Sequence, residues 1–133
     1  MPVLEDGTKG RRTVNPVLLA ARIRAWAPGE AFVEFVGPRP GEGAVGAFSF
    51  GRCRGVVEGV LGAHGVVTRF LTPPAWKRAV GIPPGKVGTK DAARSEAIRR
   101  WPARADLFAR VMDDGRAEAA LIAVAGMARE ARK

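Results

Sequence analysis

One acidic side chain stands inside the most apolar stretch of this 133-residue chain. Glu34 lies within residues 31–36, Ala-Phe-Val-Glu-Phe-Val, a pattern typical of a strand covered on both faces, as in parallel sheets. Burying an unpaired carboxylate costs several kcal/mol, so a buried Glu34 must be protonated, paired with an arginine or bound to a metal ion. An exposed strand face is the alternative that needs none of these partners.

Two further acids share one face of the last predicted helix, which covers residues 113–129. Asp114 and Glu118 are four residues apart and are therefore neighbours on that face. Helical spacing continues the face through apolar residues, which predicts that both acids extend the core-facing side. These apolar residues are Leu121, Ile122 and Ala125. Asp113, displaced by about 100° around the helix, fits a helix cap better than a metal ligand.

Three carboxylates that face one core, one from a strand and two from a helix, would make a hard-oxygen site suited to Mg²⁺ or Mn²⁺. With a polyanionic substrate, the matching chemistry is two-metal hydrolysis of a phosphodiester. One ion would activate a water molecule, and the other would stabilise the leaving oxygen.

The charge of the chain points to such a substrate. Lys and Arg number 22 against 13 Asp and Glu, which gives a net charge of +9 and a pI near 11.2. Residues 67–133 hold 14 basic and 7 acidic residues, a net +7, whereas residues 1–66 hold 8 and 6, a net +2. A small protein this basic usually binds a polyanion, most often nucleic acid. An RNA-binding or ribosome-associated protein would explain the charge but not the carboxylates on a core face.

The sequence alternates predicted helices and strands, which favours a single α/β domain over residues 1–133. Asn15-Pro16 starts a helix over residues 16–26, and Pro28-Gly29 stops it. A strand over 31–36, a helix over 49–64 and a strand over 66–71 make a βαβ unit. The other predicted elements are an irregular segment over 1–14, a loop over 37–48, a short helix from 73, a loop over 81–88, and helices over 89–100, 102–110 and 113–129.

Composition also bears on the cellular location. Cys53 is the single cysteine, so no intrachain disulfide is possible, which suits a reducing cytoplasm. No apolar run approaches the ~18–20 residues that cross a bilayer, and the first residues show no signal-peptide pattern. We therefore expect a cytoplasmic protein without a membrane partner.

Four segments occur in an order that a known family shares. They are residues 32–34 (Phe-Val-Glu), 48–55 (Phe-Ser-Phe-Gly-Arg-Cys-Arg-Gly), 72–77 (Thr-Pro-Pro-Ala-Trp-Lys) and 113–119 (Asp-Asp-Gly-Arg-Ala-Glu-Ala). On these segments the chain resembles the RuvC-type Holliday junction resolvases, particularly their phage and prophage relatives, from about residue 31 to 126. The resemblance implies a ribonuclease H-like fold, a homodimer that acts on four-way DNA junctions, and a divalent metal held by four carboxylates.

The resemblance also implies roles by position. Glu34 matches the acid on the family's fourth strand, and Asp114 and Glu118 match the pair on its last helix. Lys77 matches a lysine near the scissile phosphate, where a point charge would stabilise developing negative charge. The glycine-rich helix after Phe50 matches one that helps to form the dimer interface. The spacing of the last pair departs from the best-known members, which separate these acids by three residues rather than four.

The larger departure from the family is at the N-terminus. The family begins with a strand that carries an aspartate, and two more strands follow. Here residues 1–4 match the end of the third strand, and Asp6, in an expected polar turn, is a poor substitute for that aspartate. Either the start of the chain is assigned too late, or the chain is a shortened copy of the family, and two hypotheses follow. The chain is a metal-dependent endonuclease that cuts four-way junctions in recombination and repair, or it is a shortened, catalytically defective copy that binds branched DNA without cutting.

Aromatic and basic residues supply the predicted DNA contacts. Phe48 and Phe50, beside Arg52 and Arg54, are candidates for stacking on bases of an opened junction, although core packing is expected for at least one phenylalanine. The remaining candidates are basic side chains, for which a solvated surface is the alternative: Arg39, Lys77, Arg78, Lys86, Lys90 and Arg94. Three tryptophans are expected mostly in the core, and one histidine at a helix end or on the surface: Trp26, Trp76, Trp101 and His64.

Overall fold

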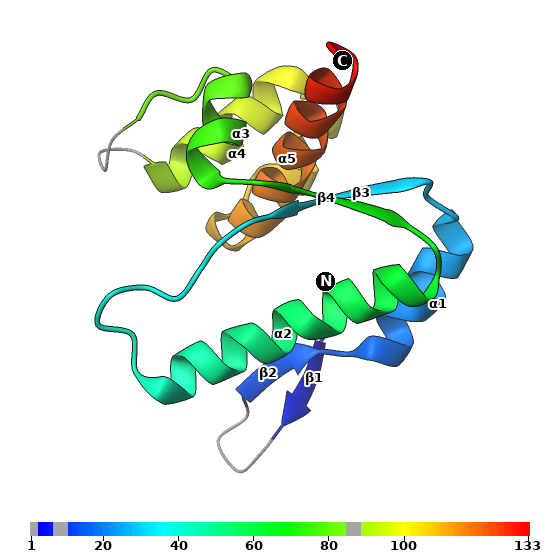
Figure 1. Ribbon diagram of the computed structural model, residues 1–133. Coiled ribbons are helices and arrows are strands. Elements are labelled where there is room, and N and C mark those ends of the chain that lie inside the picture. The colour runs from blue at the N-terminus through cyan, green and yellow to red at the C-terminus, as the bar shows by residue number, and fades with distance from the viewer. Residues whose placement is uncertain (1–2, 7–10, 85–88) are drawn as a thin grey trace. The chain divides into compact units, whose positions relative to one another are not determined.

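The computed structural model describes residues 3–6, 11–84 and 89–133, with side chains described from 13 to 84 and from 91 onward. The chain is divided into two compact units. The first unit comprises residues 1–31 and 37–68, and the second comprises residues 32–36 and 69–133. Helices and strands are both present, as expected for an α/β chain, and helices predominate (Figure 1).

The first unit begins with a hairpin of two short strands, β1 (Val3–Asp6) and β2 (Arg11–Val14). The strands are antiparallel, and the register sets Glu5 opposite Arg12 and Asp6 opposite Arg11. The expectation of an irregular segment over 1–14 is therefore wrong. Strands of four residues are too short to display a clear alternating pattern.

Helix α1 (Pro16–Trp26) begins and ends where the sequence predicts. The Asn15 side chain accepts hydrogen bonds from the backbone N–H groups of Val17 and Leu18, both at 3.1 Å. Ala27 ends the helix in the left-handed conformation, with φ of 45°. Trp26 is 66% exposed rather than part of the core, because it lies on the last turn, where the Arg22 guanidinium stands 5.9 Å from its ring centroid.

Helix α2 (Ala44–Ala63) begins five residues before the predicted start at Ser49 and ends as predicted, with His64 at its C-cap. The His64 ring nitrogen Nδ1 lies 2.9 Å from the Val60 carbonyl oxygen. Phe48 and Phe50 therefore belong to the helix. They are 75% and 43% exposed, so the expectation that at least one of them packs in the core is wrong.

Strands β3 (Glu30–Glu34) and β4 (Val67–Leu71) form a two-stranded sheet. In the first unit the Val67 N–H donates to the Gly29 carbonyl at 3.2 Å, and in the second the Phe35 N–H donates to the Leu71 carbonyl at 2.8 Å. The partner of Gly29 is Val67, and the partner of Phe35 is Leu71, so residue numbers rise together along the two strands. The strands are therefore parallel, and the predicted βαβ unit is confirmed. The expected cover on both faces is wrong. The residues of β3 are exposed or half-buried.

The second unit contains the larger core. Helices α3 (Pro73–Ala79) and α4 (Thr89–Arg100) both contact α5 (Asp114–Glu130), and two 3-10 helices, η1 (Pro102–Phe108) and η2 (Val111–Asp113), connect α4 to α5. The cluster of buried residues is built from large apolar side chains and from alanines that let the helices approach closely. Its members are Leu71, Trp76, Val80, Ile82, Ala93, Ala97, Phe108, Ala117, Leu121, Ile122 and Ala125. Three of these confirm the apolar face predicted for the last helix.

A glycine lets β3 lie against α5. A Cβ atom on Gly126 would stand 2.1 Å from Cδ1 of Phe32, closer than atoms can approach. Phe32 and Glu34 are two residues apart on a strand, so they point to the same side of it. The contact between Phe32 and Gly126 therefore turns the Glu34 side of β3 toward the helix that carries Glu118.

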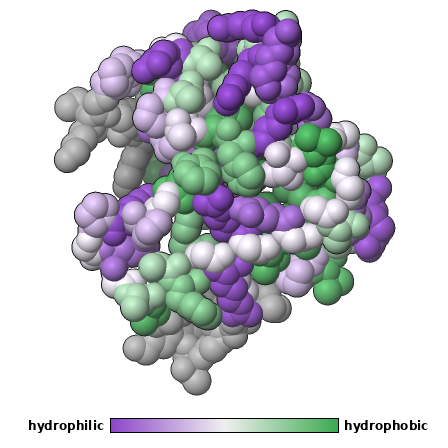
Figure 2. All heavy atoms as spheres, viewed as in Figure 1, coloured by the Kyte–Doolittle hydropathy of each residue, from purple (hydrophilic) through white to green (hydrophobic). Residues whose placement is uncertain are grey.

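Apolar side chains also reach the surface. Figure 2 shows green apolar atoms beside purple hydrophilic ones over the visible face. The most exposed large apolar residues include Phe48, Val111 and Met112, each at 75%. No helix in the described ranges is long and apolar enough to cross a membrane.

Candidate functional site

A buried tryptophan fixes the position of Glu34. Trp76 lies in α3, whose N-cap is Thr72, and it is 0% exposed. Its indole Nε1–H donates a hydrogen bond of 2.8 Å to Oε1 of Glu34. A buried indole N–H needs an acceptor, and a half-buried carboxylate needs a donor, so the pair satisfies both groups. Sequence reasoning considered arginine, a proton or a metal for Glu34 and missed this partner.

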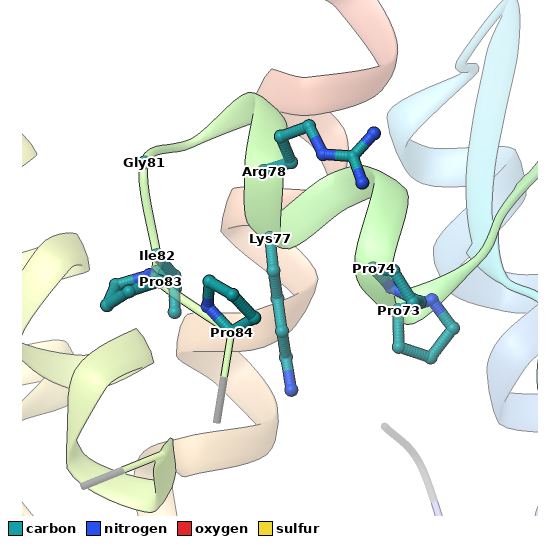
Figure 3. A pocket seen from close by; sticks show the side chains of 8 residues that line it. All are labelled: Pro73, Pro74, Lys77, Arg78, Gly81, Ile82, Pro83 and Pro84. Carbon is teal, nitrogen blue, oxygen red and sulfur yellow. The ribbon is translucent and has the colours of Figure 1, made fainter. Parts of the chain in front are cut away.

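Lys77 follows Trp76 and stays close to it. The Lys77 ammonium nitrogen is 5.5 Å from the Trp76 ring centroid, within the range of a cation–π interaction. Lys77 is half-buried and lines a hollow of about 490 Å³. Figure 3 shows the extended Lys77 side chain between Pro73 and Pro84, which come from opposite ends of the segment that forms the hollow.

Glu118 interacts with the charges of this cluster from the facing helix. It is half-buried, one turn into α5. Loss of hydration, and then the negative charge of Glu34, raise the pKa of the Glu118 carboxyl above its usual value. The positive charge of Lys77 opposes this rise in pKa, and the negative charge of Asp114 adds to it. Acids that are distant in the sequence thus act on one another within the second unit.

Asp114 does not extend the core-facing side, as the sequence analysis expected. It is exposed, and its Oδ1 accepts a hydrogen bond of 2.7 Å from the N–H of Gly115. Asp114 is the first residue of α5, so no earlier turn of that helix covers it. The core-facing stripe begins instead with Ala117, which is 0% exposed.

Asp113 has a structural role. It is 3% exposed, lies 3.0 Å from the Arg110 guanidinium and 3.8 Å from that of Arg116, and accepts a hydrogen bond from the backbone N–H of Arg110. The hydrogen bonds from Arg110 lower the pKa of the Asp113 carboxyl below its usual value. Asp113 therefore caps η2 rather than α5 and has both carboxylate oxygens occupied by arginine. It is a poor metal ligand.

The donor chemistry of the remaining acids fits a hard divalent cation. Glu34, Asp114 and Glu118 offer carboxylate oxygens. Loss of hydration and then repulsion from Glu34 raise the pKa of Glu118, and a nearby cation would favour its ionised form. Within the described residues, no three Asp, Glu, His or Cys side chains are already close enough to form a metal-binding group.

Several predicted DNA contacts lie in the first unit. Phe48, Phe50, Arg52 and Arg54 follow one another along α2, and Arg54 forms an ion pair with Glu58 one turn later. Arg39 is exposed in the segment before α2, where its backbone N–H donates to the side chain of Glu42 at 3.2 Å. The exposed phenylalanines leave aromatic surface on this helix.

The predicted basic contacts of the second unit differ in their environment. Arg78 is exposed beside Lys77. Arg94 is not free to bind phosphate, because its side chain is 14% exposed, donates to the Ala109 carbonyl at 2.9 Å and pairs with Asp91. Its role is to tie α4 to the end of η1. Lys86 and the side chain of Lys90 lie outside the described residues.

No protein-family model matches this chain, and a comparison with curated proteins found no relative.

Proposed function

We propose that this chain is a metal-dependent endodeoxyribonuclease of ribonuclease H-like architecture that hydrolyses phosphodiesters of four-way DNA junctions in recombination and repair. The observation that carries the proposal is that buried Trp76 contacts both Glu34, through its N–H, and Lys77, through its ring. Trp76 and Lys77 lie on α3, which packs against the helix that carries Glu118. A lysine beside several carboxylates is an arrangement suited to phosphoryl chemistry.

Each residue then has a defined task. Glu34, Asp114 and Glu118 would hold Mg²⁺ or Mn²⁺, and a bound ion would lower the pKa of a water molecule and neutralise charge on the phosphate. The Trp76 N–H holds one oxygen of Glu34 and so fixes the direction of the other. The Lys77 charge, which lowers the pKa of Glu118, favours the ionised carboxylate that a cation requires.

Lys77 would also meet the substrate. Its ammonium group reaches into the hollow beside α3, where a phosphate oxygen can approach it (Figure 3). A point charge there would stabilise the negative charge that develops as the bond breaks. The net charge of +9, with +7 in residues 67–133, supports a polyanionic substrate. A homodimer belongs to the same proposal, and the exposed Phe48 and Phe50 of α2 support contact with DNA or a second copy.

One observation favours a second candidate, a catalytically silent protein that binds branched DNA. Asp114 is exposed and engaged with its neighbouring N–H, so one of the three acids stands apart from the half-buried Glu34 and Glu118. In that case the basic surface would bind branched DNA, and the DNA would not be hydrolysed.

A cleavage assay on a labelled four-way junction with Mg²⁺ separates the two. Glu118→Gln should reduce cleavage by roughly a hundredfold or more and leave junction binding within about twofold, because it removes a ligand and not a DNA contact. Asp106→Asn is the matched control, since Asp106 is an exposed acid of the same unit. Removing the metal with a chelator should have the same effect as Glu118→Gln.

The results of this assay distinguish the two candidate functions. If the unaltered chain binds junctions but never cuts them under any divalent metal, the silent protein is correct. If Glu118→Gln abolishes binding and cleavage equally, Glu118 is not a metal ligand. If junctions are neither bound nor cut, both candidates are wrong.

A further inference from the structure

A second hollow, of about 530 Å³, lies on the other side of α3, where α3 meets the end of α5. Its floor is apolar and its rim is basic, which is a combination suited to an anionic ligand with an apolar part. The floor is formed by Leu71, Ala75, Ala79 and Ala125. The rim is formed by Arg78, Arg129, Arg132 and Lys133.

The charge of this rim is only partly compensated. Lys133 pairs with Glu130 at 2.9 Å, and Glu130 is also 3.4 Å from Arg69. Within the described residues, none of the other three cations of the rim forms an ion pair: Arg78, Arg129 and Arg132. Glu130 also interacts electrostatically with Arg129, so one acidic group faces several cations. The rim keeps a net positive charge, which a ligand with negative charge would neutralise. Arginine presents paired N–H donors that match phosphate oxygens.

Arg78 connects this hollow to the candidate nuclease site. It lines both hollows, and Figure 3 shows the Arg78 and Lys77 side chains leaving α3 in different directions. Basic groups thus follow one another from Lys77 through Arg78 to Arg129 and Arg132 at the end of α5. A row of cations suits a chain of phosphates better than a single small anion.

We propose that the hollow between α3 and the end of α5 is a second DNA-contact site, in which Arg78, Arg129 and Arg132 bind backbone phosphates of the strand that passes Lys77. The apolar floor would accept a sugar or an unstacked base of that strand. This inference rests on the proposed function, since it specifies where the substrate DNA lies beyond the site of hydrolysis.

The test is the salt dependence of junction binding, measured by fluorescence anisotropy with a labelled four-way junction and Ca²⁺ in place of Mg²⁺. The double variant Arg129→Ala/Arg132→Ala should weaken binding roughly tenfold near physiological salt. It should also lower the slope of log affinity against log salt by about 1.8, or about 0.9 for each lost phosphate contact. The matched control is Arg99→Ala/Arg104→Ala, which removes two exposed arginines of the same unit outside both hollows.

Stability is measured in parallel, because cations near a helix C-terminus also stabilise the helix. If the double variant melts well below the control, Arg132→Glu alone replaces it, since Arg132 is exposed beyond the end of α5. This charge reversal should weaken binding at least as much as losing the contact.

Each result bears on a different claim. Equal affinity and equal salt slope for the double variant and its control would overturn the second site. Binding of an acidic peptide in this hollow, with no competition from DNA, would also overturn it. If Lys77→Ala weakens junction binding while the double variant does not, only this inference fails. If the unaltered chain binds no DNA, the inference and the proposed function fail together.

Discussion

The longest helices of the two units differ in how many apolar residues they bury. Helix α5 buries five residues, among them Leu121 at 0% exposure. Helix α2 is three residues longer but buries Leu61 alone, and it leaves Phe48 at 75% exposure. Rigid packing is what holds charged side chains at defined distances, and α5 carries Glu118. Helix α2 instead leaves aromatic surface exposed. The two helices therefore differ in how firmly their side chains are held.

The largest expected effect tests this contrast directly. Leu121→Ala should lower the free energy of unfolding by about 2–5 kcal/mol, because it opens a cavity in the core of the second unit. Phe48→Ala should change it by less than about 0.5 kcal/mol, because the ring is largely hydrated already. Urea denaturation monitored by circular dichroism measures both values. Similar losses for the two variants would show that α2 is packed against something in solution and would remove the contrast.

Replacing glycines by alanine should change the free energy of unfolding by a smaller amount. Gly126→Ala in α5 should destabilise the chain by about 1–3 kcal/mol, because the added methyl group meets Phe32. Gly55→Ala in α2 should stabilise it by about 0.5–1 kcal/mol, since nothing lies within 4 Å of that position and alanine favours the helix. The same denaturation experiment reports both signs. A neutral Gly126→Ala would mean that β3 does not lie close to α5 and would weaken the placement of Glu34.

Local signals in the sequence were sufficient for elements whose ends are set by backbone chemistry. Asn15-Pro16 predicts the start of α1 because both preferences act within four residues. The start of α2 was predicted five residues late, because Ser49 is a stronger cap by type than Gly43, the residue that stands there. The hairpin of β1 and β2 was missed since its strands are too short for a periodic signal.

The candidate site could be predicted only where its residues depend on local helical spacing. Helical spacing places Glu118 one turn before Leu121, so its half-burial follows from the sequence. The exposure of Asp114 does not, because it depends on where the first turn of α5 begins. The hydrogen bond between Trp76 and Glu34 joins residues 42 positions apart and depends on the packing of α3 against β3. A tryptophan directly before Lys77 was a signal, since a buried indole N–H requires an acceptor.

The smallest expected effect is on the pH dependence of stability, and it differs in sign between two glutamates of the second unit, Glu96 and Glu118. Hydrogen bonds from Arg99, and then from Arg100, lower the pKa of Glu96 from 4.5 to about 2. Its ionised form stabilises the fold above about pH 4.5, and that contribution is lost as the pH falls toward 2. Glu96→Gln should therefore lower the melting temperature at neutral pH. The effect should be slight, because the ion pairs are close to solvent.

Glu118 should behave in the opposite way. Its pKa is raised, so the folded state binds the proton more tightly than the unfolded state does. The ionised carboxylate destabilises the fold once the pH exceeds the folded pKa, and this penalty is absent below the unfolded pKa. Glu118→Gln should raise the melting temperature at about pH 7 in the presence of a chelator, and the difference should vanish at about pH 4. A lower melting temperature at neutral pH would mean that Glu118 is held by a favourable partner instead of facing other carboxylates. The proposed metal site at Glu34 and Glu118 would then lose its support.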